Sequence, residues 1–139
     1  MFRHGNTILR FGGLDAFTIM EEQLSIAVDF DGVIADYDGW QENGVFGRPR
    51  ADVIEALKIL RSEGWKIIVH STRSIEEVRP YLIANCVPYD EINQNSSHET
   101  TGQKPRATVY WDDRAYRYSG DAHKDLDAIR AFRTWSGRR

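Results

Sequence analysis

Two aspartates separated by one residue are the most distinctive chemical feature of this sequence. Asp29 and Asp31 follow the short apolar run 26–28, and Gly32 comes directly after them. Residues i and i+2 of a strand face the same side, and ligands of parallel sheets bind beyond the carboxyl ends of the strands. Two carboxylates at such a position can hold a divalent cation, or can divide the roles of nucleophile and acid. Gly32 permits the sharp turn or close backbone approach that this kind of site needs.

Two other polar clusters also come directly after apolar runs. They are Ser71-Thr72-Arg73, after residues 65–70, and Asp112-Asp113-Arg114, after residues 108–111. The carboxyl ends of parallel strands meet at one edge of a sheet, so we expect all three clusters to gather there. Lys104 lies eight residues before Asp112, in a polar loop that follows residue 92.

The elements that must position these clusters alternate along the chain. Apolar runs predict strands at 26–30, 65–70, 89–92 and 108–111. Amphipathic patterns predict a helix after Pro49, a second one capped by Ser74 with Pro80 at an awkward place, and a last one over 122–132. In the last helix we expect Leu126 and Ile129 to face inward, and we expect a frayed tail over 137–139. This order predicts an α/β fold, a three-layer Rossmann-like parallel sheet with helices on both faces.

The N-terminal residues precede the first predicted strand of the sheet. Residues 1–19 fit either a loosely held extension or a hairpin around Gly12 and Gly13, and the extension is slightly favoured. Residues 20–139 are then the catalytic domain. The chain has 139 residues, a length that suits one domain with a proper core.

Composition limits the class of protein. The single cysteine, Cys86, excludes an intramolecular disulfide. No apolar run approaches the length of a membrane span, and no secretory signal is visible, so we expect a cytoplasmic protein without a membrane partner. The net charge of −3 argues against general coating of nucleic acid but leaves room for a local basic groove.

The stretch around the two aspartates resembles the first motif of the haloacid dehalogenase-like (HAD) hydrolase superfamily. Asp29, Asp31, Gly32, Val33 and Asp36 fit its pattern. The resemblance implies an HAD-like fold. Only about 40 residues separate Asp31 from Ser71, so no large cap domain is expected.

The resemblance also implies a role for each candidate residue. Asp29 would be the nucleophile that forms an aspartyl-phosphate, and Asp31 would be the acid and then the base. Ser71, with Thr72 as the alternative, and Lys104 would stabilise the charge of the phosphoryl group. The cofactor would be Mg²⁺. Its predicted ligands are Asp29, Asp31 through its backbone carbonyl, Asp112 and, through water, Asp113.

Two arginines each have two possible roles, one of which is substrate binding. Arg73 and Arg114 can hold a second phosphate or a carboxylate, or they can pair with neighbouring acids. Thr72 is a further candidate for substrate binding. His70 is interpreted as packing beneath Ser71. Tyr37, Trp40 and Phe46 can stack on a base or simply pack.

The function implied is that of a phosphoric monoester hydrolase. A nucleotide, a nucleic-acid end and a sugar phosphate are all open as substrates, and a capless enzyme can borrow a lid from a second subunit of a homo-oligomer. The alternative is a non-catalytic phosphate- or metal-binding or interaction module. A receiver domain also combines Asp, Ser or Thr and Lys around Mg²⁺, but its acid pair comes first, whereas here the pair Asp112-Asp113 comes last.

Overall fold

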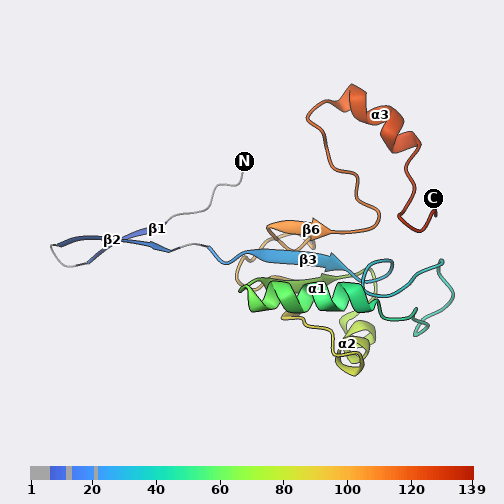
Figure 1. The fold of residues 1–139 in the computed structure, drawn as a ribbon, viewed down its shortest axis with the longest axis horizontal. Coiled ribbons are helices and arrows are strands. Elements are labelled where there is room, and N and C mark those ends of the chain that lie inside the picture. The colour runs from blue at the N-terminus through green and yellow to red at the C-terminus, as the bar shows by residue number, and fades with distance from the viewer. Residues whose placement is uncertain (1–6, 12–13, 21) are drawn as a thin grey trace.

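A computed structural model describes residues 7–11, 14–20 and 22–139 of the chain. Its central feature is a sheet of four parallel strands in the order β5-β4-β3-β6. Figure 1 shows β3 and β6 of this sheet side by side. The strands are β3 (Ser25–Asp29), β4 (Lys66–His70), β5 (Glu91–Ile92) and β6 (Val109–Trp111). The four strands lie in the apolar runs that predicted them, and they pair in parallel as expected, with β3 between β4 and β6.

Three helices follow the pattern of the sequence. They are α1 (Ala51–Ser62), α2 (Ile75–Ala84) and α3 (Ala122–Arg130). Ser74 caps α2 as expected: its hydroxyl accepts a hydrogen bond from the Glu77 N–H, and the Glu77 carboxylate accepts one from the Ser74 N–H. Pro80 is the sixth residue of α2.

One face of the sheet packs against α1 and α2. Alternation along the strands places Ile26, Val28, Ile67 and Val69 on this face. They form one buried cluster with residues of both helices: Val53, Leu57, Val78 and Leu82. Both crossovers run in the same direction, from β3 to β4 and from β4 to β5, and right-handed crossovers of that kind put both helices on one face.

The opposite face is met by the segment 93–108, which leads from β5 back across the sheet to β6. Lys66 of β4 donates a hydrogen bond to Asn95 at 2.9 Å, and Asn95 donates one to the Arg106 carbonyl, also at 2.9 Å. The expected Rossmann-like α/β fold with a parallel sheet and packed helices is confirmed. Helices were expected on both faces, whereas α1 and α2 cover one face. The third layer is built by this loop segment.

The interior side of α3 differs from the expectation. Leu126 and Ile129 are 43% and 54% exposed, whereas Asp125 is buried. Asp125 accepts hydrogen bonds from the Tyr116 hydroxyl at 2.9 Å and the Ser119 N–H at 3.1 Å. The prediction that Leu126 and Ile129 face inward is wrong because α3 packs on the loop before it and stands away from the sheet (Figure 1).

The N-terminal strands β1 (Thr7–Phe11) and β2 (Leu14–Met20) pair with each other in antiparallel fashion. The sequence left two arrangements open, an extension and a hairpin, and this pairing is that of a hairpin. Gly12 and Gly13, around which the hairpin was expected to turn, lie outside the described residues. The division into residues 1–19 and a catalytic domain at 20–139 stays a prediction. In the described part of the chain, no helix is long and apolar enough to cross a membrane.

Candidate active site

The candidate residues meet at the carboxyl edge of the sheet. Asp29 is the last residue of β3 and lies opposite His70, the last residue of β4, while Asp112 follows β6 directly. A cleft of about 1380 Å³ opens at this edge. Its walls include all nine residues singled out from the sequence: Asp29, Asp31, Ser71, Thr72, Arg73, Lys104, Asp112, Asp113 and Arg114.

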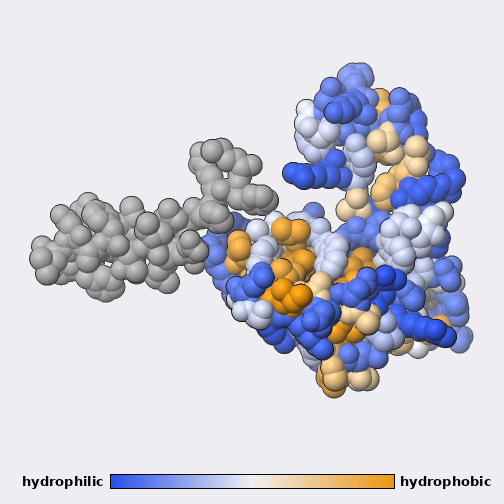
Figure 2. All heavy atoms as spheres, viewed as in Figure 1, coloured by the Kyte–Doolittle hydropathy of each residue, from blue (hydrophilic) through white to orange (hydrophobic). Residues whose placement is uncertain are grey.

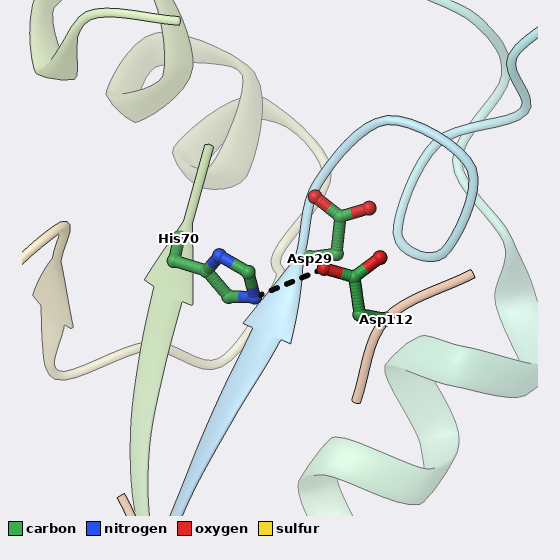
Figure 3. Close-up of side chains that lie close together, drawn as sticks. All are labelled: Asp29, His70 and Asp112. Atoms are coloured by element: carbon green, nitrogen blue, oxygen red, sulfur yellow. Dashed lines mark ion pairs between the residues drawn. The ribbon is translucent and has the colours of Figure 1, made fainter. Parts of the chain in front are cut away.

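Three side chains in the cleft could hold a metal ion. Asp29, His70 and Asp112 each offer a ligand atom, and these atoms all lie within 4.8 Å of one another (Figure 3). His70 Nε2 lies 3.8 Å from Asp112 Oδ2 and is buried without a hydrogen-bond partner in the described part of the chain. Burial lowers the pKa of His70, and the charge of Lys104 adds to this effect while Asp112 opposes it. A neutral imidazole keeps a lone pair for a metal.

His70 is a candidate metal ligand that sequence reasoning missed, since it was interpreted as packing beneath Ser71. The available signal was its position as the last residue of its strand, in register with Asp29. The other two predicted metal ligands, Asp31 and Asp113, lie in the same cleft but outside this group of three.

Asp29 is the most strongly perturbed acid of the site. Burial, a hydrogen bond with Asp113 and the charges of Asp112 and Asp113 raise the pKa of Asp29 to about 8. The Phe30 N–H donates to Asp29 Oδ1 at 2.9 Å and opposes the shift. Three carboxyl groups in this space repel one another when ionised. A divalent cation would relieve that repulsion, so the donor set fits a cation site.

Asp31 is held by Arg73. The Arg73 Nε lies 2.7 Å from Asp31 Oδ2, and Nη2 lies 3.2 Å from Oδ1. Nη2 also donates to the Val45 carbonyl at 3.1 Å, and the guanidinium lies 4.7 Å from the centre of the Phe46 ring. Arg73 is 6% exposed, so the pair is largely shielded from water. Of the alternatives left open for Arg73, the geometry matches pairing with a neighbouring acid.

Ser71 is fixed by the end of β5. Its N–H donates to Asn93 Oδ1 at 2.8 Å, and its hydroxyl accepts from the Arg73 N–H at 3.1 Å. Asn93 has a positive φ of 59°, a conformation that Asn adopts more readily than most residues, and its amide also donates to the Arg73 carbonyl. Asn93 thus orders the whole turn 71–73. Sequence reasoning missed it because it belongs to a polar stretch without a motif. Thr72 is exposed on the wall of the cleft.

Lys104 is brought to the cleft by a short loop. Its ammonium lies 4.3 Å from the centre of the Tyr110 ring, and the Tyr110 hydroxyl donates to the Pro105 carbonyl at 2.8 Å. These contacts tie the loop to β6. Lys104 makes no ion pair among residues 22–139, so its charge faces the cleft and reaches His70. Arg114 is exposed, and its N–H donates to Asp112 Oδ1 at 2.8 Å.

The turn after the two aspartates needs a glycine. Gly32 has a φ of +94°, and a Cβ at this position would overlap the Asp113 carboxylate. The Gly32 N–H donates to the Ala35 carbonyl at 2.8 Å, which closes the turn. Gly32 therefore lets Asp113 approach the backbone beside Asp29.

The C-terminal tail packs on this turn, and the expectation of a frayed tail is wrong. Trp135 Nε1 donates to the Gly32 carbonyl at 2.8 Å, and Arg138 Nη2 lies 3.4 Å from Asp113 Oδ2. The tail holds its shape because the Arg138 N–H and carbonyl both bond to Thr134. No local sequence pattern predicts the contacts of Trp135 with Gly32 and of Arg138 with Asp113.

Comparison with known proteins finds likeness in structure. No family model and no curated protein matches the chain. A conserved protein from Bacteroides thetaiotaomicron is similar over 84% of this chain and 97% of its own, with 24% identity and a TM-score of 0.55. A protein from Vibrio cholerae is 25% identical over 78% of this chain and 95% of its own, with a TM-score of 0.45. A chain of the Pnkp1/Rnl/Hen1 RNA repair complex is 19% identical over 68% of this chain and 27% of its own, with a TM-score of 0.43. The first likeness supports the α/β fold.

Proposed function

We propose that this chain is a Mg²⁺-dependent phosphatase of the HAD-like type, which hydrolyses a phosphate monoester through an aspartyl-phosphate. The observation that carries the proposal is the position of Asp29. It lies at the tip of the central strand, within 4.8 Å of Asp112 and His70 through their ligand atoms, and in the same cleft as Ser71 and Lys104. An acid nucleophile, hydroxyl and ammonium groups for the phosphoryl oxygens and a cation site are the parts that this chemistry requires.

The cation would be held by Asp29 and Asp112, with the backbone carbonyl of Asp31, and Asp113 would act through water. Oxygen donors of this kind suit Mg²⁺. Bound there, Mg²⁺ would supply positive charge for the transferring phosphoryl group. His70 adds a nitrogen donor, which suits Mn²⁺ or Zn²⁺ better than Mg²⁺, so metal preference is worth measuring.

The first step forms a bond from an Asp29 oxygen to phosphorus. The bond from phosphorus to the ester oxygen breaks, and this oxygen takes a proton from Asp31. Ser71 and Lys104 stabilise the charge on the remaining phosphoryl oxygens. In the second step water attacks phosphorus and gives its proton to Asp31, and Asp29 leaves as a carboxylate with release of phosphate. Thr72 and Arg114 lie on the cleft wall, where they would contact the rest of the substrate.

The pair between Asp31 and Arg73 favours a second candidate, a phosphate- or metal-binding module without turnover. Both Asp31 oxygens accept hydrogen bonds from the guanidinium, so Arg73 already engages the carboxyl group that the mechanism needs as an acid. Proton donation by Asp31 would require this pair to loosen when substrate binds. A chain in which the pair stays closed would bind ligands at the same cleft and release no phosphate.

Hydrolysis of a generic aryl phosphate separates the two functions. Native chain, Asp29→Asn and the control Asp38→Asn would be assayed with and without Mg²⁺, since Asp38 is exposed and outside the cleft lining. The phosphatase proposal requires Mg²⁺-dependent turnover by the native chain and the control but not by Asp29→Asn. Turnover that survives Asp29→Asn would overturn the mechanism. Mg²⁺ binding by calorimetry, without turnover of any aryl, nucleotide or sugar phosphate, would instead identify the binding module.

A further inference from the structure

The last part of the chain has a charge opposite to the rest. Residues 114–139, named here the C-terminal arm, contain seven basic and three acidic side chains and so carry +4. The other 113 residues carry −7, and the two together give the −3 of the whole chain. A polyanion would therefore be repelled by most of the molecule and attracted to the arm.

The positive charge of the arm faces solvent. Its Arg117, Lys124 and Arg133 side chains are exposed and make no ion pair within residues 22–139. Each of the three acids already has a partner: Asp125 is buried by its bonds to Tyr116 and Ser119, Asp121 caps α3, and Asp127 pairs with Arg130 at 3.2 Å. Figure 2 shows α3 and its surroundings as a largely hydrophilic surface that stands off from the body of the molecule.

Exposed aromatic rings lie within two residues of two of these cations, Arg117 and Arg133. Tyr118 is 69% exposed, Trp135 is 61% exposed and Tyr116 is 41% exposed. Flat rings on a positive surface are the recurring elements of single-strand nucleic-acid binding, because bases stack on the rings while cations track the phosphates. An acidic peptide would use the cations without needing the rings.

Both ends of the arm border the cleft. Arg114 lines the cleft itself, and the chain returns to it through Trp135 on the Gly32 carbonyl and Arg138 on Asp113. Arg138 also lies 4.5 Å from the centre of the ring of Tyr37, another residue of the cleft wall. A strand bound along the arm would thus run toward Asp29 and the carboxyl groups around it.

We infer that the C-terminal arm binds single-stranded nucleic acid and directs its phosphorylated end into the cleft. The delivery of the end rests on the proposed phosphatase function, whereas binding by the arm does not. The inference explains how a cleft rich in carboxylates accepts a polyanionic substrate: the backbone is held by the arm, and only the terminal phosphate meets the acids. It also selects the nucleic-acid end among the substrates that remained open.

Fluorescence anisotropy with a fluorescein-labelled 12-nucleotide single strand, in EDTA so that no turnover occurs, measures the binding directly. The test variant is the triple substitution Arg117→Ala, Lys124→Ala and Arg133→Ala. The matched control removes three exposed cations elsewhere: Arg48→Ala, Lys58→Ala and Arg79→Ala. We expect the test variant to bind at least tenfold more weakly at 0.1 M salt. The plot of log affinity against log salt should become shallower by about 2, since each phosphate contact on a single strand contributes about 0.7.

Stacking is tested separately with Tyr118→Ala and Tyr118→Phe. Loss of affinity in the first and its retention in the second would support the arm as a stacking platform. No oligonucleotide binding by the native chain, equal binding by test and control variants, or binding to phosphatidylserine vesicles in place of the strand would each overturn the inference. Aryl phosphate turnover should be unchanged in the triple variant, because none of its residues lines the cleft. Binding to the strand by a chain that hydrolyses nothing would leave the inference standing while the proposed function fails.

Discussion

Replacement of the proposed nucleophile should stabilise the fold. Asp29 lies among carboxyl groups and its pKa is raised from 3.8 to about 8, so ionisation of Asp29 opposes folding at neutral pH. Asparagine keeps the size of the side chain and an oxygen for the Phe30 N–H, but it carries no charge. Asp29→Asn should therefore raise the free energy of unfolding when Mg²⁺ is absent, although it removes the carboxylate of the proposed mechanism.

The pKa difference sets the size of the effect. The ordinary pKa of Asp29, 3.8, lies about three units below pH 7. Each unit is worth roughly 1.4 kcal/mol, so the destabilisation that Asp29 causes at pH 7 has an upper limit of about 4 kcal/mol. Water in the cleft screens part of this cost, so we expect a gain of about 1–3 kcal/mol and a rise in Tm of roughly 3–9 °C. From pH 4 to 8 the folded state binds more protons than the unfolded chain, so native stability falls as pH rises through this window. The advantage of Asp29→Asn should grow up to about pH 8 and then level off.

Thermal unfolding followed by circular dichroism at pH 5, 7 and 9, in EDTA and in Mg²⁺, tests this reasoning. Asp38→Asn serves as the control and should leave the pH dependence of the native chain unchanged. Added Mg²⁺ should raise the Tm of the native chain more than that of Asp29→Asn, because binding of an ion stabilises the state that holds it. A lower Tm for Asp29→Asn at every pH, or the same difference at pH 5 and pH 9, would refute the assigned electrostatics.

Two further predictions concern the turn after the aspartates. Gly32→Ala should lower the free energy of unfolding by about 2–4 kcal/mol, because the substitution adds left-handed backbone strain and a clash with Asp113. Gly44→Ala, also at positive φ but with open space around it, should cost only about 1 kcal/mol, and equal losses in urea unfolding would contradict the role of Asp113. Trp135→Phe should cost about 1 kcal/mol by removing the hydrogen bond to the Gly32 carbonyl. Hydrogen exchange of residues 32–36 should then become faster, and unchanged exchange would show that the tail does not hold the turn.

Local patterns were sufficient to predict the elements of the sheet and the candidate residues that meet in one cleft. Short apolar runs ending in polar residues predicted the parallel strands, and Asp29, Ser71 and Asp112 were expected to meet because strand ends share an edge. Ser74 predicted the start of α2, since a helix cap involves only neighbours in sequence, and the structure adds Glu77 as the other half of a capping box. Each of these predictions depends on residues a few positions apart.

The sequence did not predict the orientation of α3. Leu126 and Ile129 have the spacing of an interior face, but Asp125 takes that position because Tyr116 and Ser119 satisfy its carboxylate. Periodicity of apolar residues predicts the buried face of a helix, but it cannot predict a buried acid whose hydrogen-bond partners lie in a preceding loop.

The sequence by itself determined the chemistry available to this protein: two aspartates before a glycine, a serine after the next strand and an acid pair after the last. Tertiary structure decided which groups are free to act. It paired Arg73 with Asp31, placed His70 beside Asp112, and joined Trp135 to the Gly32 carbonyl across 103 residues. The physical reason is that hydrogen bonds and ion pairs depend on distances of a few ångströms between side chains. When one partner lies on a strand and the other on a distant loop or tail, only the packed fold sets the distance between them.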